Sequence, residues 1–232
     1  MQDQDDMRGD TQPLIDEMKA YYDHRAPWHD DYMSYESNEV MEKRLAPIIE
    51  WLEPKIEGRR VLEIGCGTGN WTQVLARRAE SVVAVDSSAK SIELAKQKQL
   101  LQRVQFAEAD IYELSGLDGR FDVVFSGDLW SHIPLQHLTR LLENVHRTLA
   151  DGGDAVWTDM LHRKADDVTR VEIDDHGNRI QLRELPDGTR YRVVKNLPSR
   201  EELVALLGDQ STSLNYQDSE ELLRWWVSYS LL

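Results

Sequence analysis

The sequence has 232 residues, 41% of them hydrophobic and 30% charged, a composition that is typical of globular proteins and excludes wholesale disorder. This length suits one sizeable α/β domain, and no apolar run approaches the roughly 20 residues that a membrane helix needs. The net charge of −15 disfavours DNA or RNA as the main partner, because the phosphate backbone would be repelled.

The first residues and the cysteine content predict a cytoplasmic protein. The opening segment, MQDQDDMRGD, is acidic and lacks the basic and then apolar pattern of a secretory signal. The single cysteine, Cys66, excludes an intramolecular disulfide and a Cys-rich zinc site, and we expect no metal. No base lies near Cys66 in the sequence, which favours a small packing residue over a nucleophile.

The segment before residue 58 predicts helices. After the acidic tail, Thr11-Gln12-Pro13 indicates a helix start before LIDEMKAYYDHR, and Pro27 interrupts that helix. The following WHDDYMSYE is rich in aromatic residues and is predicted to be irregular. A second helix is expected from Glu39 to Leu52, ended by Pro54 and Gly58.

From residue 60 onward, short apolar runs alternate with helical runs. The predicted strands are RVLEI, SVVAVD, VQFAEAD, FDVVFS and GDAVWTDM. The predicted helices between them are NWTQVLARRA, SSAKSIELAKQKQ with a Ser87 or Ser88 cap, and residues 134–149. This alternation indicates a parallel sheet with helices on both faces, and the nearly continuous apolar strands agree with burial on both sides.

After residue 161 the pattern changes to an antiparallel insertion. Turns are predicted at His176-Gly177-Asn178 and at Pro186-Asp187-Gly188, each between polar and alternating runs. PSREELVALLG then predicts a helix in which Ser199 is the cap and Glu202 completes a capping box. STSLNYQ and RWWVSYSLL are the last strand candidates, although SEELLRWW also fits a continuing helix.

The segment VLEIGCGTGNWT places Gly65, Gly67 and Gly69 directly after the first strand and before a helix. Glycines at this point let the backbone approach a nucleotide-like ligand, and the helix N-terminus adds free N–H groups. Dinucleotide enzymes use Gly-x-Gly-x-x-Gly, whereas these glycines alternate and Asn70 takes the third place. The spacing therefore speaks against a nicotinamide-dependent oxidoreductase.

An acid, Glu63, precedes the first glycine by one intervening residue, and acid-x-Gly-x-Gly-x-Gly resembles motif I of the class I S-adenosylmethionine-dependent methyltransferases. The resemblance extends to Asp86 in VVAVD, to Asp110-Ile111, to FDVVFSGDLWSHIP and to LLENVHRTLADGG. YYDHRAPWHDDY is similar to the N-terminal segment that lies over the cofactor in small-molecule members of this family.

The resemblance implies an α/β, Rossmann-like three-layer sandwich. We expect a mostly parallel seven-stranded sheet with an antiparallel last strand, a helical N-terminal lid and a small antiparallel insertion. The expected single domain divides into a tail and lid (1–35), a cofactor-binding core (36–160), the insertion (161–197), and the last helix with the final two strands (198–232).

The resemblance also implies S-adenosylmethionine as the cofactor. Asp86 would bind the ribose hydroxyls and Asp110 the adenine amino group. The predicted cofactor residues are Glu63, Gly65, Cys66, Gly67, Gly69, Trp71, Asp86, Ser87, Asp110, Ile111, Ser126, Gly127 and Tyr22. Trp71 fits core packing equally well, and Trp51, Trp225 and Trp226 are predicted to be core residues.

The acceptor is predicted to be a small molecule. Methyl transfer from a sulfonium depends mainly on alignment and desolvation, so no catalytic triad is expected. His132 is the candidate base because an imidazole titrates near neutral pH, although it also fits packing against the following helix. The predicted substrate residues are Tyr21, Trp28, His29, Asp128, Trp130, Asp159 and His162. Aromatic–carboxylate pairs at 28/30, 128/130 and 157/159 slightly favour a cationic amine.

Two alternative functions stay open at this point. The chain could bind S-adenosylmethionine as a regulatory or scaffold protein without methyl transfer, because a fold does not fix a function. It could also methylate a protein. Nucleic-acid methylation is disfavoured by the acidity and by Ser126-Gly127-Asp128-Leu129, which lacks an Asn/Asp-Pro-Pro-aromatic motif. We expect a small-molecule partner, no nucleic acid, no membrane, and a monomer or homodimer.

Overall fold

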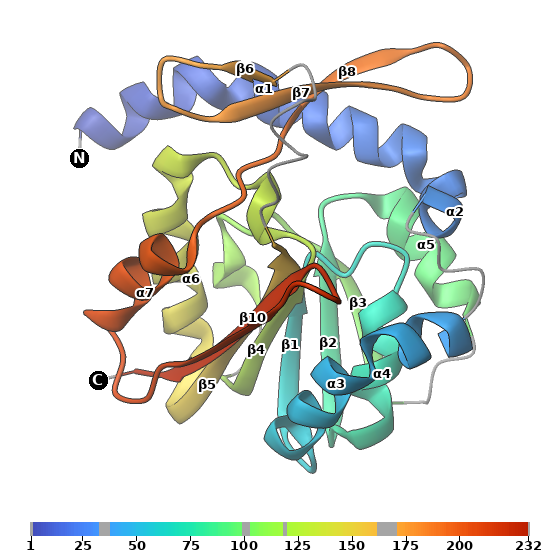
Figure 1. Cartoon of the computed structure of the whole chain (residues 1–232), viewed down its shortest axis with the longest axis vertical. Helices are drawn as coiled ribbons and strands as arrows, with labels where there is room; N and C mark the ends of the chain where they lie inside the picture. The colour runs from blue at the N-terminus through green and yellow to red at the C-terminus, as the bar shows by residue number, and fades with distance from the viewer. Residues whose placement is uncertain (1, 33–37, 99–102, 118–119, 162–170, 232) are drawn as a thin grey trace.

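The computed structural model describes residues 2–32, 38–98, 103–117, 120–161 and 171–231. A seven-stranded sheet forms its centre, in the order β3-β2-β1-β4-β5-β10-β9 (Figure 1). The parallel strands are β1 (Arg60–Ile64), β2 (Ser81–Asp86), β3 (Val104–Glu108), β4 (Phe121–Gly127) and β5 (Leu149–Met160). Strand β10 (Arg224–Ser230) runs antiparallel to both β5 and β9 (Asn215–Ser219). The predicted sheet and its antiparallel last strand are confirmed.

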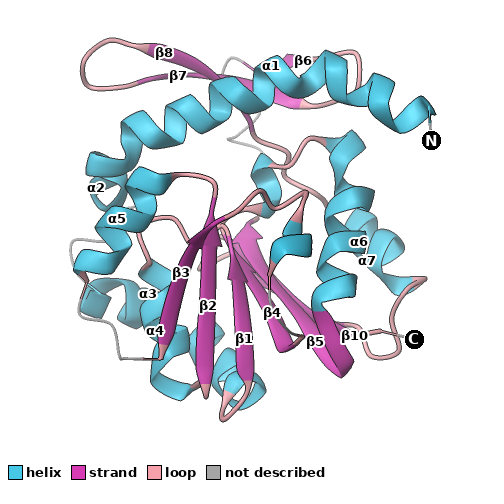
Figure 2. Cartoon of the chain, turned by 180° about the vertical axis from the view of Figure 1, so that it is seen from behind, coloured by secondary structure: helices cyan, strands magenta, loops and turns pink. Residues whose placement is uncertain are grey.

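Helices cover the two faces of this sheet as two separate apolar layers (Figure 2). One layer joins α3 (Asn38–Ile56), α4 (Asn70–Arg78) and α5 (Ala89–Gln97) to inward residues such as Val61 and Phe125. The other joins α6 (Leu138–Thr148) and α7 (Arg200–Gly208) to residues such as Leu62 and Trp157. Successive strand residues point to opposite faces, which is why these strands are apolar throughout.

A second, smaller layer lies across one end of the large sheet (Figures 1 and 2). It consists of α1 (Gln2–Arg25) and a three-stranded antiparallel sheet of β6 (Val171–Ile173), β7 (Arg179–Glu184) and β8 (Arg190–Val194). Met18 packs against Ile180 and Val194, and Tyr21 packs against Val193. The small antiparallel insertion is therefore confirmed, and it forms one apolar unit with the N-terminal helix.

Helix α1 begins earlier than predicted. It already starts at Gln2 and contains Pro13, although proline removes a helix hydrogen bond, so the prediction of a helix start at residues 11–13 was wrong. Tertiary contacts explain the difference: the Thr11 hydroxyl lies 2.8 Å from His137 Nε2, and the following turns pack on the small sheet. Beyond α1, η1 (Ala26–Trp28) and α2 (His29–Tyr32) are helical, where an irregular segment was expected.

Other boundaries move by a few residues for local reasons. Helix α3 continues through Pro54 to Ile56, and α6 is preceded by the short helix η4 (Leu135–His137). The positive φ of 55° at Leu223 is incompatible with a helix that continues through SEELLRWW, so the RWW segment belongs to strand β10. The predicted Ser88 cap and the Ser199–Glu202 capping box are present. Among the described helices, none has both the length and the apolarity for crossing a membrane.

Candidate functional site

A cavity of about 660 Å³ lies between the carboxyl ends of the central strands and the underside of α1. Its wall includes thirteen of the residues predicted from the sequence: Tyr22, His29, Gly65, Cys66, Gly67, Trp71, Asp86, Ser87, Asp110, Ile111, Gly127, Asp128 and His132. The cavity therefore joins the glycine loop to the N-terminal helix and to the loop after β4.

The three glycines of the loop all have positive φ values, of 69°, 53° and 82° for Gly65, Gly67 and Gly69. Their surroundings differ. A Cβ on Gly67 would meet no atom within 4 Å, so this position faces open space at the cavity wall. A Cβ on Gly69 would lie 3.0 Å from Ala95 Cβ, so this glycine lets α4 approach α5 and does not line the cavity.

Asp86 at the end of β2 holds the glycine loop in place. Its Oδ2 accepts a hydrogen bond of 2.8 Å from the Gly67 N–H, and its Oδ1 accepts one of 2.8 Å from the Ser88 N–H. Burial raises the pKa of this carboxyl, although these backbone hydrogen bonds oppose the rise. The Ser87 N–H also donates to Asp86, and a carboxylate has about four acceptor positions, so at least one remains for a ligand hydroxyl at the cavity wall.

The segment after β3 forms another part of the wall. Asp110 Oδ1 accepts a hydrogen bond of 2.8 Å from the Tyr112 N–H, and the exposed carboxylate lies beside Ile111. The Ala109 N–H donates to the Asp86 backbone oxygen at 3.0 Å, which fixes this segment next to β2. The two predicted acids therefore border the same cavity.

The loop after β4 contributes Gly127 and Asp128. A Cβ at Gly127 would collide with the indole nitrogen of Trp71, so only glycine allows that ring its present position. Asp128 has a φ of 64° and accepts hydrogen bonds from Arg224 at 2.6 Å and from Trp71 at 3.3 Å. Burial raises the pKa of Asp128, but the Arg224 guanidinium outweighs it and holds the pKa below its ordinary value.

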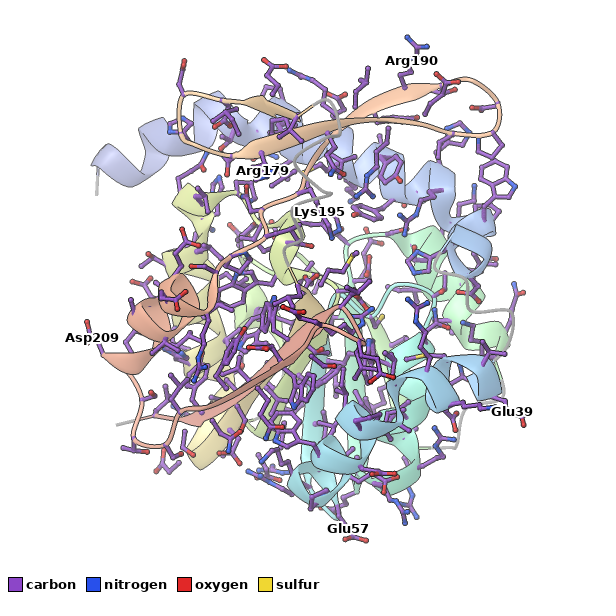
Figure 3. All side chains as sticks on the ribbon, viewed as in Figure 1. Glu39, Glu57, Arg179, Arg190, Lys195 and Asp209 are labelled. Carbon is purple, nitrogen blue, oxygen red and sulfur yellow. The ribbon has the colours of Figure 1, made fainter. Side chains whose placement is uncertain are left out.

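Two histidines on the wall are held neutral. His132 lies in η3 (Trp130–His132), and burial together with the charges of Lys195 and Arg183 lowers its pKa. His29 accepts a hydrogen bond of 2.7 Å from Arg25, and burial followed by the charge of Arg25 lowers its pKa to about 4. Figure 3 shows Lys195 between the small sheet and the strand ends.

Asp30 connects the N-terminal segment to the glycine loop, and the sequence analysis paired it only with Trp28. Its carboxylate accepts hydrogen bonds from Thr68 at 2.8 Å and Asn70 at 3.0 Å, and it forms a 2.9 Å ion pair with Lys98. Burial raises the pKa of Asp30, but the hydrogen bonds from Lys98 and the other two donors hold it below its ordinary value. No local sequence signal marks this contact, because Thr68, Asn70 and Lys98 lie 38 or more residues away in the sequence.

Six further predicted residues lie in the described structure but do not line the cavity, in addition to Gly69: Glu63, Ser126, Tyr21, Trp28, Trp130 and Asp159. Trp130 packs edge-on against Trp157 and Trp225 in the core, where Trp225 and Trp226 were predicted. Asp159 is fully buried and accepts hydrogen bonds from the Ser131 N–H and hydroxyl.

These contacts have a physical origin in the strand register. Residues two apart on a strand share a face, so Asp159 follows Trp157 into the core and points away from the glycine loop. The geometry therefore gives Trp130 and Asp159 no contact with a ligand in the cavity. The predicted His162 lies outside the described residues. Among the described residues, no group of three or more His, Cys, Asp and Glu side chains could hold a metal ion.

Comparisons with known sequences agree with this geometry. The family model described as a methyltransferase domain matches residues 61–153. A cypemycin N-terminal methyltransferase from a Streptomyces species is 31% identical over 132 residues, which cover 54% of each chain. A ubiquinone biosynthesis O-methyltransferase from Dechloromonas aromatica is 30% identical over 146 residues, which cover 61% of this chain and 60% of the relative. The chain spans about half the length of the curated relatives it matches.

Solved structures with the same fold cover nearly the whole chain. The structures described as "DhpI-SAH complex structure" and "DhpI-SAM-HEP complex" are 26% identical with a TM-score of 0.75, covering 94% of this chain and 97% of theirs. A glycopeptide N-methyltransferase, MtfA, shares the fold at 15% identity and a TM-score of 0.62, covering 82% of this chain and 90% of its own. With its matched methyltransferase-domain model, glycine loop, strand-end acids and sheet order, the chain is similar to the class I S-adenosylmethionine-dependent methyltransferases.

Proposed function

We propose that this protein transfers a methyl group from S-adenosylmethionine to a small molecule bound beneath α1. One observation carries the proposal: a single cavity joins the glycine loop and Asp86 to Tyr22, His29 and His132. Its volume of about 660 Å³ falls in the range of small-molecule sites, which measure roughly 300–1,000 Å³. The cavity can accommodate a cofactor and a compact acceptor together.

The residues present fit S-adenosylmethionine. The open space at Gly67 suits close approach of a ligand to the backbone, and Asp86 retains at least one acceptor position for a ribose hydroxyl. Asp110 and Ile111 would border the adenine, as the family resemblance implies. Cys66 is buried with a raised pKa, which supports a packing role in the loop.

When bound, S-adenosylmethionine supplies an activated methyl group on a sulfonium sulfur. The task of the chain is then to align an acceptor, exclude water and receive a proton where the acceptor carries one. Side chains of α1, among them Met18 and Tyr22, line one side of the cavity. His132 is neutral and reaches the wall, so it can receive a proton, which supports its predicted role as base.

The sequence-based preference for an amine gains no support from the three aromatic–carboxylate pairs. Asp30 forms an ion pair with Lys98, Asp128 forms one with Arg224, and Asp159 accepts a hydrogen bond from Ser131. Each carboxylate therefore already has a partner within the protein. A protein substrate is disfavoured because α1 lines one side of the cavity and the small sheet packs on α1. Cytoplasmic residence and a monomeric or dimeric state stay predictions of the sequence.

The experiment that tests the proposed function has two stages. Titration calorimetry with S-adenosylmethionine, S-adenosylhomocysteine and NAD is expected to give binding of the first two ligands alone. Production of S-adenosylhomocysteine is then measured with a panel of small acceptors. Binding without any turnover favours the regulatory or scaffold alternative, and binding of NAD alone contradicts the family-based function.

Replacing Asp86 by alanine is expected to weaken binding of S-adenosylhomocysteine about tenfold, since hydrogen bonds to a charged group are lost. The loop also loses the contact with the Gly67 N–H. Calorimetry measures the dissociation constant, and Asp122→Ala at the opposite end of the sheet is the matched control, because Asp122 pairs with Arg60 away from the cavity. Equal affinity of Asp86→Ala and wild type would place the cofactor elsewhere.

Replacing Asp30 by asparagine is expected to make the N-terminal segment more accessible to protease. The substitution removes the ion pair with Lys98 and weakens the hydrogen bonds from Thr68 and Asn70, which hold α2 on the glycine loop. Limited proteolysis with and without S-adenosylhomocysteine measures the effect, and we expect several-fold faster cleavage within residues 2–32. Cleavage at the wild-type rate would show that these contacts do not hold the segment closed.

A further inference from the structure

We propose that the atom methylated by this protein is an oxygen of a small hydroxyl compound or oxyacid, whose O–H group donates to His132 Nε2 and which accepts a hydrogen bond from His29 Nε2. This inference rests on the proposed function and names the acceptor class for the same site. It follows from which ring nitrogens of the two cavity-wall histidines are already hydrogen-bonded within the protein.

The tautomer of His132 is fixed by a backbone carbonyl. Its Nδ1 lies 2.7 Å from the Val194 oxygen, and a carbonyl oxygen only accepts, so Nδ1 carries the proton. The neutral ring then has a bare Nε2, and no described residue makes a hydrogen bond to that atom. His132 lines the cavity. The ring therefore presents a hydrogen-bond acceptor to a bound molecule.

His29 has the opposite tautomer. Its Nδ1 lies 2.7 Å from Arg25 Nη2, and a guanidinium only donates, so Nδ1 is the acceptor of that bond. The neutral ring then carries its proton on Nε2, which no described residue accepts. Because His29 also lines the cavity, this ring presents a donor.

Tyr22 supports the ring of His132 at the cavity. The two rings pack edge-on with centroids 5.4 Å apart, and Arg25 Cζ lies 5.1 Å from the Tyr22 centroid. The Tyr22 hydroxyl oxygen is enclosed by protein atoms, so this side chain contributes packing to the wall and not a hydrogen bond to a bound molecule.

One donor and one acceptor on the wall match an oxygen nucleophile. An O–H group donates once and has two lone pairs, so it can donate to His132, accept from His29 and keep one lone pair for attack on the methyl carbon. A neutral amine has a single lone pair, which the attack uses, so the His29 N–H would be left without an acceptor.

The basicity of His132 also suits oxygen. The cations that face His132 are Lys195 after β8, Arg183 on β7 and Arg25 on α1, and burial with these charges lowers its pKa. Such a weak base cannot deprotonate an ammonium group before attack. An O–H proton becomes acidic as the oxygen shares its electrons with the methyl carbon, so a weak base suffices at that moment.

The transfer balances as follows in atoms and charge. The oxygen forms a bond to the methyl carbon while the carbon–sulfur bond breaks and its electron pair stays on sulfur. The O–H proton passes to His132 Nε2 and is later released to water. The products are a methyl ether or ester, S-adenosylhomocysteine and one proton.

The first test identifies the methylated atom directly. The protein is incubated with S-adenosylmethionine carrying a ¹³C-methyl group, together with a low-molecular-mass cell extract and, separately, phenol, benzoic acid, phenylphosphonic acid, aniline, benzylamine and thiophenol. The ¹³C chemical shift of the transferred methyl separates O-, N- and S-methyl products. We expect O-methyl product, and N- or S-methyl product alone would overturn the inference while leaving methyl transfer intact.

The second test needs no acceptor and therefore decides the inference even where no product forms. Nitrogen NMR of the histidine-labelled protein with S-adenosylhomocysteine reports which ring nitrogens carry protons at neutral pH. We expect a bare Nε2 on His132 and a protonated Nε2 on His29. A charged His132 ring, or the reverse tautomer on either residue, would overturn the inference. Failure to bind S-adenosylmethionine at all would instead overturn the proposed function.

Two variants assign the roles of the wall residues. His132→Gln is expected to lower kcat by about 100-fold or more, and His29→Phe to raise KM for the acceptor about tenfold. Both are expected to bind S-adenosylhomocysteine as wild type does. His176→Gln, in the exposed turn between β6 and β7, is the matched control and keeps wild-type kinetics. Unchanged kinetics in His132→Gln would remove its role as proton acceptor.

Discussion

Replacing Gly67 by valine is expected to weaken S-adenosylhomocysteine binding about 100-fold or more, equivalent to roughly 2.8 kcal/mol of binding free energy. At Gly67 a side chain would extend into the open space of the cavity, where the ligand approaches the backbone. The φ of 53° adds strain for a β-branched residue. Titration calorimetry measures the loss, and circular dichroism checks that the fold is retained.

Gly58→Val separates occupation of the cavity from backbone strain. Gly58 has a φ of 67°, and a Cβ there also meets no atom within 4 Å, but it lies in the turn before β1 and not at the cavity. We expect this control to lose stability to the same degree while keeping its affinity for S-adenosylhomocysteine. A similar loss of affinity in both variants would mean that strain, and not ligand contact, explains the effect of Gly67→Val.

Replacing Glu63 by glutamine is expected to stabilise the protein increasingly as the pH rises. Glu63 is 2% exposed, and burial raises its pKa to about 8, to which the neighbouring Asp86 charge adds. In the unfolded chain a glutamate titrates near pH 4.3, so between these values the folded state binds a proton that the unfolded state has lost. The contribution of Glu63 to the free energy of unfolding of the wild type is therefore fully present below about pH 4.3 and declines as the pH rises toward 8.

The glutamine variant has no such proton to lose. Its advantage over wild type is expected to be near zero at pH 4.5 and to reach about 2–4 kcal/mol at pH 8. Urea unfolding across this pH range measures the free energy of unfolding. Glu57→Gln, at an exposed position in the same part of the chain, serves as control and is expected to show no pH-dependent gain. A constant difference between Glu63→Gln and wild type at all pH values would contradict a protonated Glu63 in the folded protein.

Regular local patterns made the central part of the fold predictable. Strands β1 and β2 match the predicted segments residue for residue, because their apolar runs are bounded by a turn on one side and by the glycine loop or Asp86 on the other. Once the strands are parallel, the acids at their carboxyl ends must meet at one edge. The position of Asp86 and Asp110 on one cavity follows from this rule.

Contacts between distant segments could not be read from local patterns. The interaction of Asp30 with Lys98 joins residues from α2 and from the end of α5, and no periodicity reports it. The same limitation explains Trp130 and Asp159, whose spacing from other aromatic and acidic residues resembled a binding site. Trp130 in η3 packs against Trp157 and Trp225, and Asp159 at the end of β5 is buried on Ser131. Burial also lowers the pKa values of His29 and His132, and distant hydrogen-bond partners set the tautomer of His132, which composition alone does not reveal.

The hydrogen bond from His132 to Val194 depends on the backbone of β8 and not on its side chains. The ring is oriented by a main-chain oxygen that every amino acid supplies, so substitution at position 194 leaves the proton on the same nitrogen. The antiparallel sheet can therefore diverge in sequence at its exposed positions without disturbing the base. Only an insertion or deletion that shifts the backbone of β8 would change the chemistry of the imidazole. The side chains of the β6–β8 segment can thus change while its backbone keeps the His132 ring in the same orientation.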